Sequence, residues 1–551
     1  MTAAGFDRAT SLRRLADERF DLLVIGGGIT GAGVAVDAAS RGLKVALVER
    51  HDFASGTSSK SSKLVHGGLR YLQQKEYKLV YENLHERQRL LENAPHLVTP
   101  LPFLIPLFGK SGTVNKTVAK AYRTALWLYD ITGGLRIGKR HKRVTKEEAL
   151  AHLPTLNTDL LAAAFLYYDA QADDARLTLT LLRTAADHGA VIANHVPVVE
   201  LTKDADGRVR GARLDGGIAV RADVVVNATG VWADDVRELA EGEHPDSIRP
   251  AKGIHITVPA AKLPCDIAAV VPVPKDRRSI FVVPWGEHTY LGTTDTDYTG
   301  DRDHPECTAG DVRYVLDAIN LFVTSPLTEA DVVGTWAGLR PLVKNEGKAR
   351  TADLSRRHKV LVSDSGMVTI TGGKLTTYRK MAQDTVDEVG DQLGRKLKRS
   401  HTASLKVRGV DGLDKLRSEG ATKLGVEAAT FTHLVARYGT DTRAIAELVV
   451  ADPTLAEPLV PKLPYLRAEA IYAARHEMAH TLEDVLSRRT RALLLERDGA
   501  AAVAADVARL VASELGWDED EQRRQVDAFV AVADRERVAA QTMPAEPATT
   551  V

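Results

Sequence analysis

The clearest pattern of apolar positions lies between residues 21 and 50, where two short apolar runs enclose a glycine-rich segment. The runs are Leu22–Ile25 and Val45–Val48. Four consecutive apolar residues next to glycines are typical of strands that lie buried within a parallel sheet. A helix is expected between the runs, over about Gly31–Arg41, with Gly42 at its end. The pattern therefore predicts a strand, a helix and a second strand in that order.

Three glycines at the first turn of this unit carry a binding signature. Gly26, Gly28 and Gly31 fit the spacing G-x-G-x-x-G, which provides a tight turn, backbone approach to a pyrophosphate and close helix–strand packing. The helix N-terminus directs N–H groups and the positive end of its dipole toward the phosphates. Glu49 ends the second strand about 20 residues later, where a carboxylate can bind ribose hydroxyls. Because a carboxylate disfavours a 2′-phosphate, the sequence favours NAD or FAD over NADP.

The periodicity of apolar residues changes further along the chain. An amphipathic helix is predicted over Ala175–Asp187, and strands are predicted over 191–201, 209–214 and 224–226. Later segments alternate apolar and polar residues as antiparallel strands do, namely 251–258, 280–284 and 289–293. After about residue 400, alanine and leucine recur at helical spacing, which indicates a helical C-terminal domain.

Length and composition narrow the class of protein. At 551 residues the chain is too long for one hydrophobic core, so two or three domains are expected. Lysine plus arginine and aspartate plus glutamate both number 73, which gives no indication of nucleic-acid binding. Cys265 and Cys307 lie far apart without metal-ligand spacing, as suits a reducing compartment. No signal peptide and no run of about 18 apolar residues stands out, so a cytosolic protein is expected.

A polar segment, Ser55–Leu72, follows the predicted nucleotide-binding unit and combines unusual residue types. Small hydroxyl residues precede His66, Gly67 and Gly68, and Arg70 comes next. Small residues let the backbone approach a flat cofactor, while His66 and Arg70 would bring a titratable group and a fixed cation close to it. A polar loop with a surface histidine is the alternative interpretation.

These two segments together closely resemble the FAD-dependent glycerol-3-phosphate dehydrogenases, flavoproteins of the D-amino-acid-oxidase-like group. The resemblance covers roughly residues 18–385. Further motifs that carry it are VNATGVWAD at 226–234, PWGEHTYLGTTDTDY at 284–298, GLRPLV at 338–343, LSRRH at 354–358 and TGGKLTTYRKMA at 371–382. The resemblance implies FAD as cofactor, an α/β Rossmann-like FAD-binding domain, an antiparallel-sheet substrate domain and a C-terminal all-α domain.

The chain is accordingly expected to divide into three domains. The predicted FAD-binding domain is discontinuous and comprises residues 18–95, 155–235 and 355–390. The predicted substrate domain comprises residues 96–154 and 236–354, and the helical domain comprises residues 400–540.

The family's motifs also imply which residues bind the cofactor. Gly230 would let a turn pass close to the flavin, and the segment 371–377 would open a helix whose N–H groups hold the flavin's pyrimidine edge. Lys374 would add positive charge near a reduced, anionic flavin. The expected cofactor-binding residues are Gly26, Gly28, Gly31, Glu49, Ser58, Ser59, Ser62, Gly67, Gly68, Gly230, Gly373, Lys374, Leu375 and Thr376.

Arginines at the sites that the family uses for substrate phosphate imply a phosphorylated substrate. Glycerol phosphate is a dianion near neutral pH, and the planar guanidinium of arginine binds phosphate oxygens bidentately. Arg70, Arg340 and Arg356 would hold the phosphate or polarise the hydroxyl, with support from Lys374. Arg356 is chosen over Arg357 because neighbours in an extended segment point to opposite sides.

The implied reaction is the oxidation of sn-glycerol 3-phosphate to dihydroxyacetone phosphate by hydride transfer to the flavin. His66 is the candidate base, because imidazole titrates near the operating pH, with His255 and solvent as rivals. Lys252 and His255 could face the pocket or the surface of a sheet. Quinone is the expected electron acceptor, while oxygen stays open.

The stretch Leu101–Arg143 joins an apolar, proline-containing run and an apolar helix to a basic cluster, a combination that could rest on an anionic bilayer. A helix packed on the core beside a solvated charged loop is the alternative. The expected protein is cytoplasmic and could lie on the inner face of the cell membrane. A homodimer is also expected as a possibility.

A second motif, His476-Glu477-Met478-Ala479-His480, matches the zinc-protease signature H-E-x-x-H, with Glu496 as a conceivable third ligand. Its setting in an arginine-rich helical tail favours polar contacts between helices, so no metal is expected. Three alternatives to the dehydrogenase remain: another flavin oxidase acting on an amine or hydroxy acid, a zinc protease, and a non-catalytic NAD-binding regulator.

Overall fold

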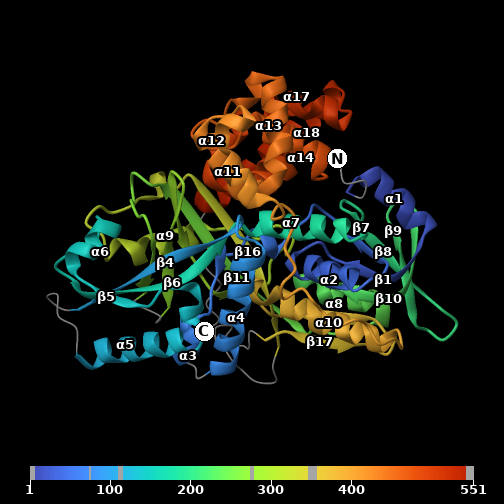
Figure 1. Ribbon diagram of the computed structural model, residues 1–551, viewed down its shortest axis with the longest axis horizontal. Helices are drawn as coiled ribbons and strands as arrows, with labels where there is room; N and C mark the ends of the chain where they lie inside the picture. Colours follow the sequence, from blue (N-terminus) through green and yellow to red (C-terminus); the bar gives the residue numbers. More distant parts are fainter. Residues whose placement is uncertain (1–5, 74–75, 110–115, 274–277, 345–356, 542–551) are drawn as a thin grey trace, which may run out of the picture.

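Two β-sheets lie side by side, and a bundle of helices covers the junction between them (Figure 1). The computed structural model describes residues 6–73, 76–109, 116–273, 278–344 and 357–541. The predicted fold class is confirmed, with an α/β domain, a domain built on a mostly antiparallel sheet and a helical C-terminal domain.

The first sheet has a parallel centre. In spatial order its strands are β17 (Lys359–Val362), β18 (Val368–Thr371), β10 (Ala219–Asn227), β1 (Arg19–Ile25), β2 (Val45–Val48) and β7 (Val191–Ala193), with β9 (Val209–Leu214) beside β10 and β8 (Val198–Lys203) beside β9. From β18 to β7 the strands run parallel, so their carboxyl ends lie at one edge. One strand is expected over 191–201, but the structure has two, because the chain turns at His195, whose φ is +52°.

Helices cover both faces of this sheet. On one face α2 (Ile29–Ser40) packs between α10 (Tyr378–Gln392) and α7 (Asp174–Asp187). The other face is covered by α1 (Arg8–Asp17), α8 (Ala233–Glu241) and the β8–β9 hairpin. Successive residues of β1 and β2 therefore enter two different cores, which explains why both strands are continuous apolar runs.

The second sheet is mostly antiparallel. In spatial order its strands are β15 (Thr296–Asp297), β11 (Ile248–Pro259), β14 (His288–Gly292), β13 (Ser279–Trp285), β12 (Ala268–Pro272), β4 (Val98–Phe108), β6 (Leu161–Ala172) and β3 (Leu64–Val65), with β16 (Gly334–Val343) beside β11 and β5 (Lys142–Val144) beside β6. Among the described strand pairs of this second sheet, β12 and β4 form the parallel pair. The helices around the second sheet are α3 (Leu69–Gln73), α4 (Tyr77–Asn93), α5 (Lys116–Ile131), α6 (Lys146–His152) and α9 (Ala309–Asn320).

The domain boundaries stay a prediction, but the sheet that contains two of the strands differs from the predicted assignment. β3 and β6 fall in segments assigned to the FAD-binding domain, yet both strands pair within the second sheet. The chain thus crosses between the sheets inside the segment 55–72 and again between β6 and α7.

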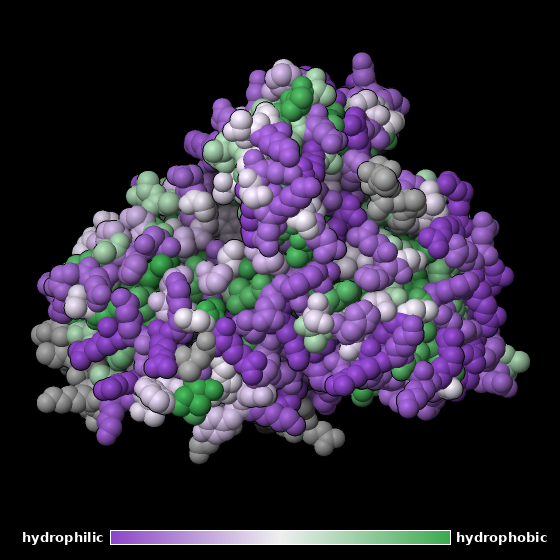
Figure 2. Space-filling view, viewed as in Figure 1, coloured by the Kyte–Doolittle hydropathy of each residue, from purple (hydrophilic) through white to green (hydrophobic). Residues whose placement is uncertain are grey.

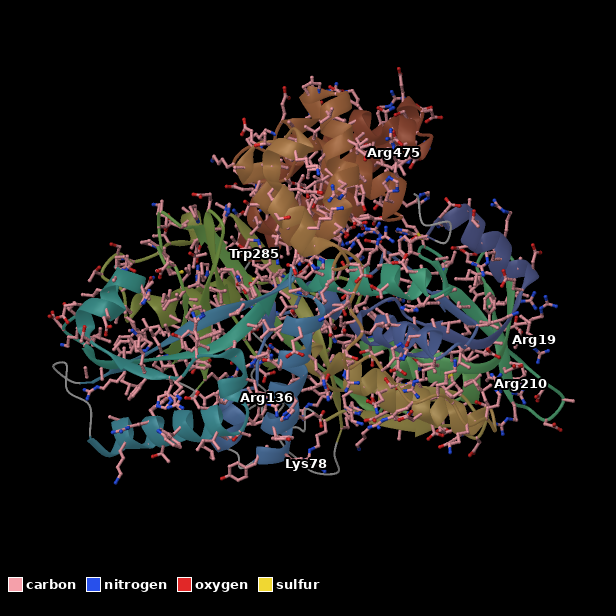
Figure 3. The ribbon with its side chains drawn as sticks, in the orientation of Figure 1. Arg19, Lys78, Arg136, Arg210, Trp285 and Arg475 are labelled. Carbon is pink, nitrogen blue, oxygen red and sulfur yellow. The ribbon has the colours of Figure 1, made fainter. Side chains whose placement is uncertain are left out.

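The C-terminal domain is helical from residue 413 onward. Its helices are α11 (Leu413–Leu424), α12 (Ala428–Tyr438), α13 (Thr442–Ala451), α14 (Arg467–His476), α15 (Ala492–Leu495), α16 (Arg497–Ala502), α17 (Ala504–Leu515) and α18 (Glu519–Gln541). Trp285 of β13 packs against this domain's core, at its junction with the second sheet (Figure 3). Within the described ranges, no helix is long and apolar enough to cross a membrane.

We expect the substitution Gly31→Ala to destabilise the fold strongly. A Cβ at Gly31 would lie 1.9 Å from the carbonyl oxygen of Gly26, and backbone cannot move away as a flexible side chain can. Overpacking of this kind costs about 1–3 kcal/mol or more, and thermal unfolding measures it. Gly499→Ala in α16 is the control, because its Cβ would meet its nearest neighbour at 3.4 Å, and its effect is expected within about 1 kcal/mol. Equal melting temperatures for the two variants would contradict the packing argument.

Candidate functional site

A cavity of about 530 Å³ opens at the carboxyl edge of the first sheet. Its walls come from the loops that follow β1 and β2 and from the turns that follow β10 and β18. Pro341 of β16 adds a contribution from the second sheet. In open α/β sheets, ligands bind outside the carboxyl ends of the parallel strands, and this volume suits a small-molecule cofactor.

The glycine turn between β1 and α2 forms one end of the cavity. Gly26 and Gly28 line it, and Gly28 occupies the N-cap of α2 with no side chain to cover the helix end. Gly31 lies one turn into the helix, in contact with the Gly26 carbonyl rather than with the cavity. Ser58 approaches from the following loop, where its Oγ accepts a hydrogen bond of 2.8 Å from the N–H of Ile29. The turn therefore combines open backbone, a helix N-terminus and one hydroxyl, which fits a dinucleotide pyrophosphate.

Glu49 lies at the end of β2 and lines the same cavity. Its carboxylate accepts hydrogen bonds from the N–H of Gly27 at 2.7 Å and from the N–H of His51 at 2.9 Å. Burial raises the pKa of Glu49, while the two backbone bonds oppose that shift. The carboxylate thus joins the glycine turn to the second loop, in the position where a ribose is expected.

Two further turns complete the wall. After β10 the chain continues through Ala228, Thr229 and Gly230, and Asn227 holds this turn by accepting from the Thr229 hydroxyl at 2.7 Å. After β18 the segment Gly372–Leu375 lines the cavity before α10 begins. Val196 and Pro197, between β7 and β8, and Val198 at the start of β8 also line the cavity, so five segments of the first domain that are far apart in the sequence assemble it.

The polar segment 58–68 connects this wall to the second sheet. The Tyr290 hydroxyl donates to the Ser62 carbonyl at 2.8 Å, and His255 Nε2 lies 2.9 Å from Ser62 Oγ. Trp336 stacks on His255 with ring centroids 4.7 Å apart and donates from Nε1 to the Ser61 carbonyl at 3.2 Å. Strands β11, β14 and β16 thus all hold one loop of the cofactor side.

Arg340 lies on the same face of the second sheet as His255. The two residues occur on the adjacent strands β16 and β11, where Arg340 pairs with Ala251 and Trp336 pairs with His255. The guanidinium of Arg340 donates to Thr293 Oγ1 and to the Thr294 carbonyl, both at 3.1 Å. Burial, followed by the charges of Lys63 and Arg340, holds the pKa of His255 well below its usual value, so its ring is neutral.

His66 and Lys374 form a second pair, contributed by the loop before α3 and the turn before α10. The Lys374 Nζ lies 3.8 Å from the centre of the Tyr71 ring. The Thr376 hydroxyl accepts from the N–H of His66 at 3.2 Å, which ties the two segments together. Burial, and then the charge of Lys374, lowers the pKa of His66 to about 4. His66 is therefore an uncharged imidazole beside a fixed cation at neutral pH.

A buried polar cluster supports the turn His66–Gly68 from behind. The Tyr129 hydroxyl lies 2.6 Å from an oxygen of Asp169, and the N–H of Gly67 contacts both side chains, at 3.0 Å and 3.2 Å. Arg87 donates to Asp169 at 2.6 Å, and the Asn83 amide donates to the Gly67 carbonyl at 2.9 Å. Burial raises the pKa of Tyr129 well above its usual value, so the hydroxyl keeps its proton. The turn is fixed by side chains of α4, α5 and β6.

The expected cofactor-binding residues divide into two groups in the structure. Those that line the cavity are Gly26, Gly28, Glu49, Ser58, Gly230, Gly373, Lys374 and Leu375. Those that lie behind its wall are Gly31, Ser59, Ser62, Gly67, Gly68 and Thr376. The roles of all of them stay predictions.

The expected substrate residues are brought together only in part. Arg340, Lys374, His66 and His255 all lie where the two sheets meet. Arg70 lies in α3, but its side chain, like the whole of Arg356, is outside the described residues. Lys252 donates to Asp311 at 2.6 Å at the N-terminus of α9.

The H-E-x-x-H match does not form one helical surface. Helix α14 ends at His476, and Met478 has a φ of +52°, so His480 follows outside the helix. Glu477 is buried and pairs with Arg176 and Arg183 of α7. The motif therefore belongs to the contact between domains.

Several residues of the site lack a local sequence signal. Lys63, Trp336 and Asp169 become part of it largely through contacts between distant segments, as in the 2.6 Å bond from Arg87 to Asp169. Asp52 follows Glu49 by three residues, but its partners Arg488 and Arg489 lie in the C-terminal domain. In the sequence, the one signal for these residues is that most of them are charged, because a charged side chain that becomes buried requires partners.

Comparison with known families agrees with this geometry. A family model described as FAD dependent oxidoreductase matches residues 21–379, and a second, described as the C-terminal domain of alpha-glycerophosphate oxidase, matches residues 400–522. The fold and the cavity thus define an FAD-dependent oxidoreductase of the D-amino-acid-oxidase-like group, and FAD is its cofactor.

Similar proteins narrow the family further. Glycerol-3-phosphate dehydrogenase 2 of Mycobacterium tuberculosis is 42% identical over 548 residues, covering 98% of this chain and 92% of that protein. The human mitochondrial glycerol-3-phosphate dehydrogenase is 38% identical over 532 residues, covering 92% of this chain and 72% of that protein. The crystal structure of the glycerol-3-phosphate dehydrogenase from Bacillus halodurans complexed with FAD matches with a TM-score of 0.79 and 32% identity, covering 99% of this chain and 100% of that chain. The chain belongs to this family of FAD-dependent glycerol-3-phosphate dehydrogenases.

We expect the neutral state of His66 to make stability depend on pH. Because the pKa of His66 falls from its usual 6.5 to about 4 on folding, the unfolded chain binds more protons between these values. Stability from this group is therefore complete above pH 6.5 and is lost as the pH falls toward 4. Melting temperatures at pH 7.5 and at pH 5 should differ less in His66→Asn than in the wild type. His304→Asn, at an exposed histidine, should keep the wild-type difference, and an equal difference in all three proteins would contradict the prediction.

Proposed function

We propose that the protein oxidises sn-glycerol 3-phosphate to dihydroxyacetone phosphate and passes the electrons to a quinone. The observation that carries this proposal is that a cation and a buried histidine lie together on each side of the junction between the sheets. Burial and then Lys374 lower the pKa of His66. Burial, then Lys63 and Arg340, lower the pKa of His255, which shares a face of the second sheet with Arg340. The names of the relatives, which share 38–42% of their residues with this chain, support the same substrate.

The two cations suit a dianionic phosphate ester. Arg340 already donates to the oxygen atoms of Thr293 and Thr294, so its guanidinium is oriented by the segment that follows β14. Lys374 stands over the Tyr71 ring, which restricts the position of its ammonium group. Phosphate oxygens would join these partners, since charge-assisted hydrogen bonds to phosphate are about twice as strong as neutral ones. Arg70 and Arg356 stay proposed members of the same site.

The neutral histidines suit removal of a proton from the substrate's carbon-2 hydroxyl. Oxidation breaks the C2–H and O–H bonds, and FAD, when bound, accepts the hydride. His66 can accept the hydroxyl proton, because a pKa of about 4 leaves its imidazole unprotonated at neutral pH. His255 is the rival, and its Nε2 already contacts Ser62 Oγ at 2.9 Å. The proton finally leaves to solvent, and the product is a ketone.

We expect the purified holoenzyme to lose its oxidised-flavin absorption bands when glycerol 3-phosphate is added under anaerobic conditions. Glycerol, which lacks the phosphate, should leave the bands unchanged at the same concentration. Arg340→Gln should lower kcat/KM about 10- to 100-fold, because one hydrogen bond to a charged group contributes about 1.5–3 kcal/mol. Arg313→Gln is the control, since Arg313 of α9 pairs with Glu329 and is half-exposed.

Bleaching by an amine or a hydroxy acid, with none by glycerol 3-phosphate, would overturn the substrate and favour a flavin oxidase. Wild-type kcat/KM in Arg340→Gln would remove that residue from the site. His66→Asn, with flavin still bound and turnover unchanged, would remove His66 from the mechanism.

A quinone acceptor is supported by the surface around α5. Large apolar side chains are exposed there, with Trp127 at 55% and Ile131 at 60% on α5 and Tyr81 at 53% on α4. Exposed basic residues lie on the same helix and on neighbouring elements, namely Lys78, Lys120, Arg123, Arg136 and Lys139. Lys78 lies at the lower edge of the molecule and Arg136 above it in the common view, and hydrophobic residues are also visible in this lower part (Figures 2 and 3). An apolar helix face with basic residues nearby suits the surface of an anionic bilayer.

The same helix reaches the cofactor side. Tyr129 on its inner face contacts the Gly67 N–H at 3.0 Å, while Trp127 and Ile131 face outward. The thickness of one helix, about 10–12 Å with side chains, therefore separates this exposed face from the turn His66–Gly68. A quinone in the bilayer would therefore be close enough to the cofactor side to accept its electrons. The proposed protein is cytoplasmic and bound to the inner face of the membrane, and a homodimer stays a prediction.

We expect the double variant Trp127→Ser/Ile131→Ser to bind anionic vesicles at least about 10-fold more weakly, because burying one such side chain contributes about 1.5–3 kcal/mol. Cosedimentation with vesicles of phosphatidylcholine, with and without phosphatidylserine, measures the partition. Val450→Ser is the control, since Val450 is 61% exposed in the C-terminal domain. Equal partitioning of the wild type and both variants would place any membrane contact elsewhere.

A further inference from the structure

The helical C-terminal domain meets the cofactor domain through buried arginines as well as through apolar side chains such as Met478. Arg488, Arg489 and Arg491 are only 7%, 1% and 1% exposed, and they follow one another at the wide helical turn η10 (Asp484–Arg489) and just beyond it. No described residue from 400 to 541 lines the cofactor cavity. Any effect of this domain on the cofactor therefore acts through the segments that it contacts, and its arginines contact two cavity loops.

Two of the arginines hold the loop that follows β2. Arg488 Nε donates to Asp52 at 2.6 Å, and Arg489 forms two bonds to the same carboxylate, at 2.7 Å and 2.8 Å. Asn194 completes the set with a bond of 3.0 Å. Asp52 is fully buried and follows Glu49 by three residues, within the loop whose neighbours Arg50, His51 and Ala54 line the cavity.

The third arginine holds the loop that carries Ser58. Arg491 donates to the Ser59 carbonyl and lies 3.2 Å from Asp174. The Asp174 carboxylate also accepts from the Ser61 hydroxyl at 2.6 Å and from Lys63 Nζ at 3.0 Å. This loop in turn reaches the glycine turn, because Ser58 Oγ accepts from the N–H at the start of α2.

Charges buried this deeply are stable only while all their partners stay in place. The carboxylates come from the cofactor domain, and the guanidinium groups come from the C-terminal domain. Docking of that domain over the junction of the sheets (Figure 1) therefore adds buried contacts that help to hold both loops in their cavity-lining positions. Preorganised loops bind a ligand more tightly because less conformational freedom is lost on binding.

We propose that the C-terminal helical domain is a cofactor-retention element that fixes two loops of the FAD cavity through Arg488, Arg489 and Arg491. This role goes beyond the proposed reaction and is independent of the substrate. Asp52 and Asp174 are the positioning residues on the cofactor side. FAD loss, rather than loss of substrate binding, is the expected consequence of loosening this contact.

The test compares two carboxylate-to-amide variants of the full-length chain, Asp52→Asn and Asp441→Asn. Asp441 also joins the two domains, through a 3.0 Å contact with Arg183 of α7, and it contacts Arg408 of its own domain at 2.8 Å, but it touches neither cavity loop. Apoprotein of each variant is titrated with FAD while flavin fluorescence is recorded, without substrate. Circular dichroism at the same temperature establishes that the protein is folded.

We expect Asp52→Asn to bind FAD at least 10-fold more weakly than the wild type, while Asp441→Asn stays within about twofold. Arg491→Lys, which keeps the charge but cannot form the same pair of contacts, should weaken FAD binding in the same direction and is used if Asp52→Asn does not fold. Wild-type FAD affinity in folded Asp52→Asn or Arg491→Lys would overturn the proposal. The proposal would also be overturned if both variants, Asp52→Asn and Asp441→Asn, lost FAD affinity in the same proportion as they lost melting temperature. The loss of affinity would then reflect general destabilisation. Because no substrate is present, these outcomes are separate from the test of the reaction.

Discussion

The structure depends on one buried carboxylate, that of Asp174, which joins the first domain to the C-terminal domain and lies one residue away from the second sheet. It lies at the N-terminus of α7 in the first domain and accepts from Ser61 and Lys63 of the segment 58–68 and from Arg491 of the C-terminal domain. Lys63 then lies 4.8 Å from the centre of the Trp336 ring in the second sheet. Removing one partner of a buried ion pair typically costs about 3–5 kcal/mol, because the other charge is left without compensation. The relative position of the two sheets is thus tied to a few charged atoms.

This arrangement explains the composition of the segment 58–68. Its regular structure is confined to the short turn η1 (Thr57–Ser59) and to β3, so its path is set largely by side-chain bonds. Ser58 contacts the start of α2, Ser61 contacts Asp174 and Ser62 contacts His255. Small side chains are needed where backbone approaches a flat cofactor, but here the hydroxyls also join three elements. A polar loop on the surface would need no such set of partners, and Lys63 would not be 3% exposed.

The sequence predicts what is determined locally and misses what is determined by distant partners. The unit β1–α2–β2 is readable because its strands are buried on both faces and its glycines have fixed spacing. Strand β4 is harder to recognise because it contains Pro100, Pro102 and Pro106. These prolines occupy alternate positions, so the side of the strand that lacks N–H groups is the same for all three and faces away from β6. On that side β4 pairs with β12, and only at Phe103 and Leu104. The cluster of Asp52 with Arg488 and Arg489 has no local pattern, because more than 400 residues separate its members.

The electrostatics of the site set two requirements against each other. A dianionic substrate needs cations nearby, but the same cations lower the pKa of a neighbouring histidine and weaken it as a base, as Lys374 does to His66. On the proposed function, the conflict is resolved by the substrate itself. Its phosphate would offset the charges of Lys374 and Arg340, and the pKa of each adjacent histidine would rise toward its usual value. The base would then be strongest when the substrate is bound and weakest in the free enzyme. Proton acceptance would thus be coupled to phosphate binding without any movement of the backbone.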